Sequence, residues 1–362
     1  MSIEQQLDTE RVKQITENRN KIKPIIEAII LCGRQNISLR GHRDDGRLVI
    51  TKSDDNDLKN NEGNFREILR YRAQGDLNLK MCLESDGTIK YTSKTSQNSI
   101  IEACNSVLLK NIVARVNFAK CFSILADETA DISGVEQMSL CVRFVDLNKL
   151  VLCEEFLQFV PAHDTTGKGL ANLILETLKQ FGVELKFLRG QGYDGAASMS
   201  GIYNGVQSHI RQIYPSAMYV HCSAHILNLV VSKSCGVRPI MNCLSLIGEI
   251  RDFFIHPKRK NVLSYKILDS SNDTTKKTLK RSCATRWIER YHAVHDFLEL
   301  FEFIVESFSE ISEWNDHDTS GKAQRLQKSI LDGEFIISLL ILSKGFGFGL
   351  PLSKQLQKLH MI

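Results

Sequence analysis

Two aspartates each follow a short apolar run and carry side chains suited to phosphate chemistry. Asp127 closes the stretch "KCFSILAD", and Asp194 sits in the glycine-rich stretch "RGQGYDGAASMSG". Cleaving or joining phosphodiesters needs charge neutralisation at phosphorus and an activated oxygen, which two Mg²⁺ ions roughly 3.5–4 Å apart can supply. Such ions prefer carboxylate oxygens on rigid strand ends. Both aspartates are therefore candidate metal ligands; the alternative, that they form turns or cap helices, stays open.

The glycine-rich stretch itself does not read as a phosphate-cradling loop. It lacks the G-K-S/T ending of a P-loop, and "GQGYDG" follows a late strand, whereas a dinucleotide fold places G-x-G-x-x-G after an early one. We interpret the stretch as a turn that positions Asp194. The small residues after Asp194 would let a nucleic-acid backbone approach closely.

The apolar pattern around the two aspartates predicts an α/β order of elements. Residues 121–126, "EQMSLCVRFVD" and "LVLCEEFLQFV" predict three antiparallel strands, with the turn "DLNK" before the third. A helix capped by Asp164 or Thr165 and ended by Gly182 follows. Then "VELKFLR" predicts a fourth strand, a short helix follows at 202–213, and "AMYVHC" predicts a fifth strand before another helix. This β-β-β-α-β-α-β-α order is that of the RNase H-like fold, in which the first and fourth strands are adjacent and parallel, so Asp127 and Asp194 would meet.

A second motif, "HCSAHILNL", places Cys222 and His225 three residues apart at a helix start. With Cys235 and Cys243 a zinc site can be drawn, but the spacings are irregular and the helix pattern is apolar. A hydrogen-bonded, partly buried histidine is the alternative, and we do not expect zinc.

A basic segment later in the chain offers candidate nucleic-acid contacts. Residues 256–290 hold ten Lys or Arg against three acids, and residues 291–320 hold eight acids and no Lys or Arg. Indole and guanidinium planes stack on unpaired bases, and basic side chains contact phosphate. A tryptophan at a helix start also serves as a core residue, and a solvated loop beside an acidic helix would give the same charge pattern. The candidates are Lys258, Arg259, Lys260, Arg286, Trp287 and Arg290.

Bulk composition limits the class of protein. The chain has 362 residues, is 43% hydrophobic and carries a net charge of +4, which is too small to argue for nucleic acid alone. Its ten cysteines include no C-x-x-C pair, which favours reduced thiols in a cytosolic or nuclear protein. The N-terminus predicts no signal peptide. The most apolar run, residues 335–342, is too short to span a bilayer, so we expect no membrane partner.

Four ordered motifs resemble a known family. "FSILADETAD", "GQGYDGAASMSG", "HCSAHILNLVV" and "CATRWIERY" stand in the order and approximate spacing found in hAT-superfamily transposases, and more narrowly in transposon-derived proteins of the zinc finger MYM type. "LRGHRDD" and "NNEGNFREIL" also resemble the region before the catalytic core of that group. The resemblance spans residues 37–362.

The resemblance implies a fold and a domain division. The fold is an RNase H-like core interrupted by an all-α insertion. Residues 1–119 would form an N-terminal helical region with a flexible loop at about 41–64, residues 120–235 the core, and residues 236–362 an incomplete insertion domain.

The resemblance also implies roles for the candidate residues. Asp127 and Asp194 would be the first two members of a catalytic acidic triad that holds Mg²⁺ or Mn²⁺. Cys222 and His225 would shape the active site without binding zinc, and Trp287 would stack on a flipped base. The third acid, a glutamate after the insertion, would lie beyond "LSKQLQKLHMI", and Glu249 comes too early to replace it.

Two functions follow as expectations. One is a transposase-derived domain that is catalytically incomplete as given. We expect this chain, which lacks the family's usual zinc fingers, to be a fragment of a longer protein. The alternative is a host-adopted regulatory module that binds DNA or protein without chemistry. A metal-dependent nuclease of another kind would need a further acid within the chain. The family places such proteins in the nucleus and makes homo-oligomers possible.

Overall fold

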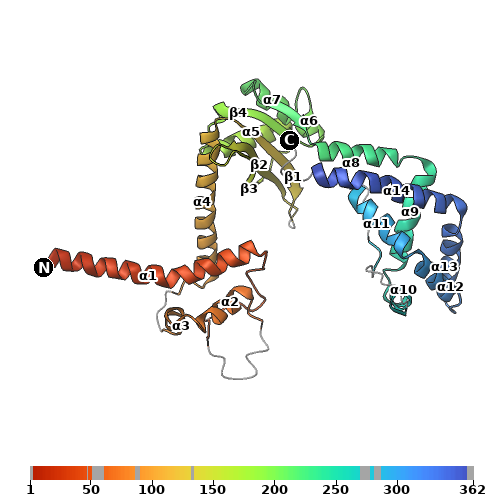
Figure 1. Cartoon of the computed structure of the whole chain (residues 1–362), viewed down its shortest axis with the longest axis horizontal. Helices are drawn as coiled ribbons and strands as arrows, with labels where there is room; N and C mark the ends of the chain where they lie inside the picture. The colour runs from red at the N-terminus through yellow and green to blue at the C-terminus, as the bar shows by residue number, and fades with distance from the viewer. Residues whose placement is uncertain are drawn as a thin grey trace. The chain divides into compact units, whose positions relative to one another are not determined.

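The computed structural model describes residues 3–46, 48–50, 61–85, 90–131, 134–269, 278–280 and 287–356, with the side chains of residues 3–9 left out. The chain divides into two compact units, Met1–Ile112 and Val113–Ile362. Figure 1 shows the elements of each unit. Part of the loop predicted at 41–64 lies outside the described residues.

The first unit is helical and is built from α1 (Ile3–Arg34), α2 (Asn64–Ala73), α3 (Leu77–Glu84) and the start of α4 (Lys94–Ala119). Its core joins Ile25, Phe65, Leu69, Leu79 and Leu83, each at most 1% exposed. Burial of these side chains supplies the driving force for packing α1 against α2 and α3.

Two glycines let the motifs "LRGHRDD" and "NNEGNFREIL" cross in the first unit. A Cβ on Gly41 would lie 2.5 Å from the backbone nitrogen of Gly63. Gly63 itself has φ +92°, which only glycine adopts readily. Beside this crossing, buried Arg66 donates to the carbonyls of Asp45 (2.8 Å) and Gly46 (2.9 Å). The two motifs therefore form one local structure.

The second unit contains a mixed five-stranded sheet in the order β3-β2-β1-β4-β5. β1 pairs antiparallel with β2 and parallel with β4; β3 pairs antiparallel with β2, and β5 parallel with β4. The predicted element order and the parallel pairing of the first and fourth strands are confirmed. The strands are β1 (Phe122–Ala130), β2 (Glu136–Asp146), β3 (Val151–Pro161), β4 (Leu188–Tyr193) and β5 (Met218–His221).

Helices α5 (Gly167–Gln180), α6 (Ala197–Ser200) and α7 (Val206–Ile213) connect the later strands. The cap of α5 is Thr166, whose Oγ1 accepts from the Gly169 nitrogen at 3.1 Å. The prediction of Asp164 or Thr165 at this position is therefore wrong, because Asp164 accepts from the Thr166 nitrogen in the turn before the cap. Gly182 ends the helix with φ +82°, as predicted.

The fourth strand lies later than predicted. Residues Leu185–Phe187 form a 3₁₀ turn, and the strand begins at Leu188 and runs through the glycines of "LRGQGY". The apolar run that predicted a strand at "VELKFLR" instead places Val183, Leu185 and Leu188 in the core. The first part of the glycine-rich stretch is thus strand, and the turn begins at Asp194.

The remaining elements are helices with a separate core. They are α8 (Ser223–Ser234), α9 (Arg238–Phe253), α10 (Pro257–Asp269), α11 (Trp287–Glu299), α12 (Phe301–Ser312), α13 (His317–Ile330) and α14 (Gly333–Leu356). Ile250, Phe253, Phe297 and Phe308 lie at the centre of this core.

Among the described helices, α14 is long and apolar enough to cross a membrane by length and composition alone. The run at 335–342, which on its own is too short to span a bilayer, is therefore part of a longer apolar helix. The length of the run alone does not decide whether the helix could span a membrane. One face of α14 is buried in the helical core.

Candidate functional site

Strand pairing aligns Asp127 with Asp194. Leu125 of β1 is registered with Gly192 of β4, and continuing this parallel register by two residues brings Asp127 opposite Asp194. Neighbouring strands lie about 4.8 Å apart, so the two residues lie side by side where β4 ends, while β1 continues to Ala130. We call this end of the β1–β4 pair the aspartate edge. On the other side of β1, Asp127 pairs with Ser139, whose hydroxyl donates to the Asp127 carbonyl at 3.0 Å.

The sheet face that carries Asp127 is open. Alternate residues of β1 face opposite sides, and Phe122, Ile124 and Ala126 are buried whereas Asp127 is exposed. Leu125 and Ser123 share the side of Asp127, and they lie over Gly192 and Gly190, where a Cβ would come within 2.7 Å and 2.4 Å of their side chains. A ligand can therefore approach Asp127 from this face.

The turn that holds Asp194 is supported by β5, a feature that the sequence motifs did not predict. Oδ1 of Asp194 accepts from the Ala196 nitrogen at 3.1 Å, and the Tyr219 hydroxyl donates to the Asp194 carbonyl at 3.1 Å. Next to Asp194, a Cβ on Gly195 would lie 2.7 Å from Cε1 of His221. Alternation in "MYVH" puts Tyr219 and His221 on one side, and this was the only available sequence signal.

Glu128 follows Asp127 directly but occupies a different environment. Strand alternation turns it to the side of Ile124 and Ala126, and its Oε1 is buried without a hydrogen-bond partner among the described residues. Burial raises the pKa of Glu128, and the charges of Asp194, Glu136 and Asp127 raise it further. This carboxyl group is therefore easier to protonate than that of an exposed glutamate.

The described residues do not assemble a metal centre. Among them, no group of three or more His, Cys, Asp or Glu side chains could hold a metal ion. The Mg²⁺ or Mn²⁺ implied by the family would thus find Asp127 and Asp194 without a third protein ligand in this part of the chain. Two carboxylates, together with waters and substrate phosphates, would suffice for one such ion, whereas a site for two ions would need further ligands.

Cys222 and His225 lie beside the aspartate edge at the start of α8. The Cys222 nitrogen donates to the Tyr193 carbonyl at 2.9 Å, which extends the β4–β5 pairing by one bond. The His225 ring centroid is 5.7 Å from that of His221. Both motif residues therefore adjoin the strand and ring that support Asp194.

Glu249, the acid that the sequence placed too early, is engaged elsewhere. Oε1 of Glu249 accepts a hydrogen bond from Arg325 at 2.8 Å and lies 3.7 Å from Nζ of Lys322. These two contacts join α9 to α13.

The structure places Trp287 in the helical core. Its side chain is 2% exposed and its ring centroid lies 5.9 Å from that of Phe346. The backbone nitrogen of Trp287, at the start of α11, donates to Oδ1 of Asn228 at 2.9 Å. In this conformation neither ring face is free to stack on a base. Arg286 lies outside the described residues.

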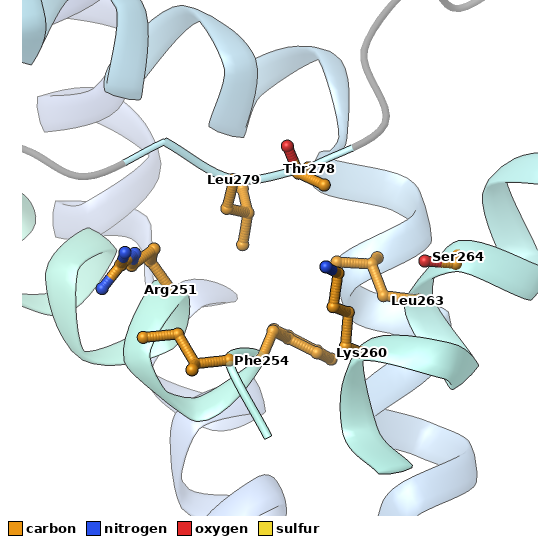
Figure 2. A pocket seen from close by; sticks show the side chains of 8 residues that line it. Arg251, Phe254, Lys260, Leu263, Ser264, Thr278 and Leu279 are labelled. Carbon is orange, nitrogen blue, oxygen red and sulfur yellow. The ribbon is translucent and has the colours of Figure 1, made fainter. Parts of the chain in front are cut away.

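The other basic candidates have separate neighbours. Lys258 sits 4.3 Å above the Trp314 ring, and Arg259 sits 4.4 Å above the Phe253 ring. Lys260 lines a cavity of about 240 Å³ together with Arg251 and the apolar side chains Phe254, Leu263 and Leu279 (Figure 2). Arg290 contacts the Cys235 thiol and partly offsets the rise in its pKa that burial causes. The structure does not gather these residues into one stacking surface.

A mixed α/β sheet with two acids aligned at one edge, followed by packed helices, defines the class of this protein as an RNase-like domain with a helical region. Residues 1–205 match the family model DUF4371, described as "ZMYM1/FAM200, RNase-like domain". The chain belongs to this family, and the predicted resemblance to the zinc finger MYM-type group is confirmed.

Two curated relatives extend the match along the chain. The human protein named 52 kDa repressor of the inhibitor of the protein kinase is 29% identical over 353 residues, which cover 94% of this chain and 45% of the relative. The mouse protein of the same name is 29% identical over 358 residues with the same coverage. The chain thus spans less than half the length of these relatives.

Proposed function

We propose that this chain is a hAT-like, transposase-derived domain with an RNase H-like sheet that does not by itself cleave or transfer DNA strands. The parallel β1–β4 register, which aligns Asp127 with Asp194 on adjacent strands, carries the proposal. Two acids that meet on adjacent strands are what a metal-dependent phosphodiester enzyme needs to bind its divalent ions. The strand order β3-β2-β1-β4-β5 is the order expected of that fold.

The proposed lack of activity follows from the small number of metal-binding side chains at the aspartate edge. Asp127 and Asp194 offer carboxylates, whereas Glu128 is desolvated on the other side of β1. Without a third ligand, the described residues supply no site for two divalent ions, and we derive no catalytic step through a metal.

A second candidate function is a host-adopted regulatory module that binds DNA or protein in the nucleus. The name shared by the two relatives, a repressor of an inhibitor, supports this candidate. The exposed apolar side chains on the open side of the sheet support it as well. Phe156 and Phe159, registered with Cys141 and Ser139, are both exposed, and their ring centroids lie 4.9 Å apart.

A nicking assay tests the main proposal. The purified 362-residue chain is incubated with Mn²⁺ and hairpin-ended DNA, and we expect no nicked product. Nicking by the wild-type chain that disappears in Asp127→Ala would overturn the proposed inactivity. Binding of the same DNA without nicking, measured by fluorescence anisotropy, would favour the regulatory module.

A further inference from the structure

The end of α9 and the first half of α10 border a cavity that is separate from the aspartate edge (Figure 2). Its volume is about 240 Å³. Its floor is apolar, because Phe254 and Leu263 line it, are 4% and 3% exposed, and belong to the helical core. Leu279 covers the cavity from the opposite side and packs against the same core. An apolar part of a ligand would therefore find contacts above and below it.

The lining of this cavity carries positive charge and no negative charge. Of the eight described residues that line it, Arg251 and Lys260 are basic and none is acidic. Figure 2 shows the Lys260 ammonium pointing into the cavity, whereas the Arg251 guanidinium turns outward. Arg251 donates to Asp252 at 2.6 Å, while no carboxylate in the described part of the chain pairs with Lys260. Lys260 can therefore pair with an anion that enters the cavity.

The neighbours of Lys260 on α10 are engaged differently. Lys258, Arg259 and Lys260 all lie in the first turn of this helix, which contains no acid. The helix macrodipole disfavours positive charge at this end, so a bound anion would relieve part of the repulsion. Lys258 lies over the Trp314 ring and Arg259 over the Phe253 ring. Lys260 is thus the cation of this turn that faces the cavity.

The size of the cavity limits the apolar part of the ligand. An apolar cavity of about 150 Å³ holds benzene, so a volume of about 240 Å³ accommodates roughly two fused rings. Water that lies on Phe254 and Leu263 makes few hydrogen bonds to the protein, and its release would favour binding. The cavity therefore suits a ligand that joins a flat apolar body to an anionic group.

The short lining argues against a polymer as the occupant. Peptides and single-stranded nucleic acids bind along grooves that continue from one residue or base to the next. Here the lining covers about one turn at the end of α9, residues 251–255, one turn of α10, residues 260–264, and residues 278–279. A small molecule fits this extent, and an extended chain does not.

We propose that the cavity between α9 and α10 binds a small organic anion with a flat apolar body, such as an aryl carboxylate, sulfonate or phosphate. Phe254, Leu263 and Leu279 would contact the body, and Lys260 would pair with the anionic group. For a ligand of this size we expect a dissociation constant on the order of 0.1–1 mM. The proposal is independent of the function proposed above, since no lining residue belongs to the aspartate edge.

Titration of the 362-residue chain with naphthalene-2-sulfonate, read from line broadening of the ligand's NMR signals, tests the proposal. We expect saturable binding, and binding about tenfold weaker for the neutral analogue naphthalene-2-sulfonamide, because an ionic hydrogen bond to Lys260 is lost. Sulfate, which has no apolar body, should also bind at least about tenfold more weakly.

Variants of α10 locate the site. Lys260→Gln should weaken binding of the sulfonate about tenfold and leave binding of the sulfonamide unchanged. Lys258→Gln removes the same charge two residues away, over the Trp314 ring, and should bind both probes as the wild type does. Ser264→Phe should abolish binding of both probes, because Ser264 lines the cavity and the new ring would fill it. Asn261→Phe, at an exposed position outside the lining, is the control for Ser264→Phe.

Four results would overturn the proposal. The wild-type chain could show no saturable binding of the sulfonate, or could bind the sulfonamide or sulfate as tightly. Lys258→Gln and Lys260→Gln could weaken binding equally, which would indicate general charge attraction. Binding could survive in a folded Ser264→Phe variant; if that variant does not fold, the comparison of the two lysine variants decides. Binding of adenosine monophosphate without binding of the sulfonate would show that the site recognises nucleotides instead.

Discussion

Gly195 lies directly against the ring of His221. A Cβ on Gly195 would come 2.7 Å from Cε1 and 2.8 Å from Nε2 of that ring. The absence of a side chain at Gly195 therefore lets β5 approach the turn that holds Asp194. Nε2 of His221 is buried and has no hydrogen-bond partner in the part of the chain that the structure describes, so packing holds the ring here.

Gly195→Ala should destabilise the second unit by about 1–3 kcal/mol, the usual cost of overpacking. The new methyl group forces either the His221 ring or the Asp194 turn to move, since both are fixed by the sheet. Chemical denaturation followed by circular dichroism measures the change. Gly248→Ala is the control, because Gly248 lies within α9 and a Cβ added there would meet no atom of the described residues within 4 Å, so this change should be neutral or mildly stabilising. Equal unfolding free energies for the two variants would contradict the close packing of Gly195.

Trp287→Ala should destabilise the helical core by about 3–5 kcal/mol, because the indole is 2% exposed and packs on Phe346. Trp287→Phe should retain most of the stability. Thermal unfolding followed by circular dichroism compares the variants, with Tyr265→Ala as an exposed aromatic control. A Trp287→Ala variant as stable as the wild type, but weaker in binding single-stranded DNA, would instead favour the stacking role implied by the family.

Much of the sheet could be predicted because its strands show clear local patterns. "EQMSLCVRFVD" alternates in polarity and forms β2 from Glu136 to Asp146. β4 could not be placed in the same way, since its glycines carry no polarity signal. Gly190 and Gly192 are required by Ser123 and Leu125 on β1, and a contact of this kind depends on pairing between distant segments.

The same reason limits prediction of the site. Asp127 and Asp194 stood out because each was associated with a predicted strand end, and the predicted order of elements made those two strands neighbours. Tyr219 and His221 support Asp194 only through the register of β5 on β4, which local sequence does not encode. The environment of Trp287 likewise depends on Phe346 and Gly349, residues of α14 far along the chain.

Asp146 should make the second unit sensitive to acid. Burial alone would raise its pKa, but hydrogen bonds from the Asn148 and Lys149 backbone and from Arg115 outweigh it and hold the pKa of Asp146 below its ordinary value of 3.8. The ionised carboxylate therefore stabilises the folded state at pH values above its pKa in the unfolded chain. This contribution is lost as the pH falls through the lower pKa that Asp146 has in the folded state.

Asp146→Asn should consequently be less stable than the wild type at pH 7, with a difference that narrows as the pH falls below 3.8. Denaturant titrations at a series of pH values measure the difference. Asp252→Asn is the control, because that side chain is 68% exposed in its pair with Arg251 and surface pairs contribute little. A gap between wild type and Asp146→Asn that stays constant below pH 3.8 would show that the charge of Asp146 is not the cause.

The cysteines should differ widely in reactivity. Burial raises the pKa of Cys243 to about 12, and its thiol lies 3.9 Å from the Phe335 carbonyl within the helical core. At pH 8 only about one Cys243 thiol in ten thousand would be ionised, and the thiolate is the reactive form. Cys121 and Cys222 are exposed. Timed alkylation with iodoacetamide, read by peptide mass spectrometry, should label these two residues at least about a hundredfold faster than Cys243. Unfolding in guanidinium should abolish the difference, because the protection comes from burial. Equal labelling of Cys243 and Cys222 in the native protein would mean that the core between α9 and α14 opens readily and does not protect the Cys243 thiol.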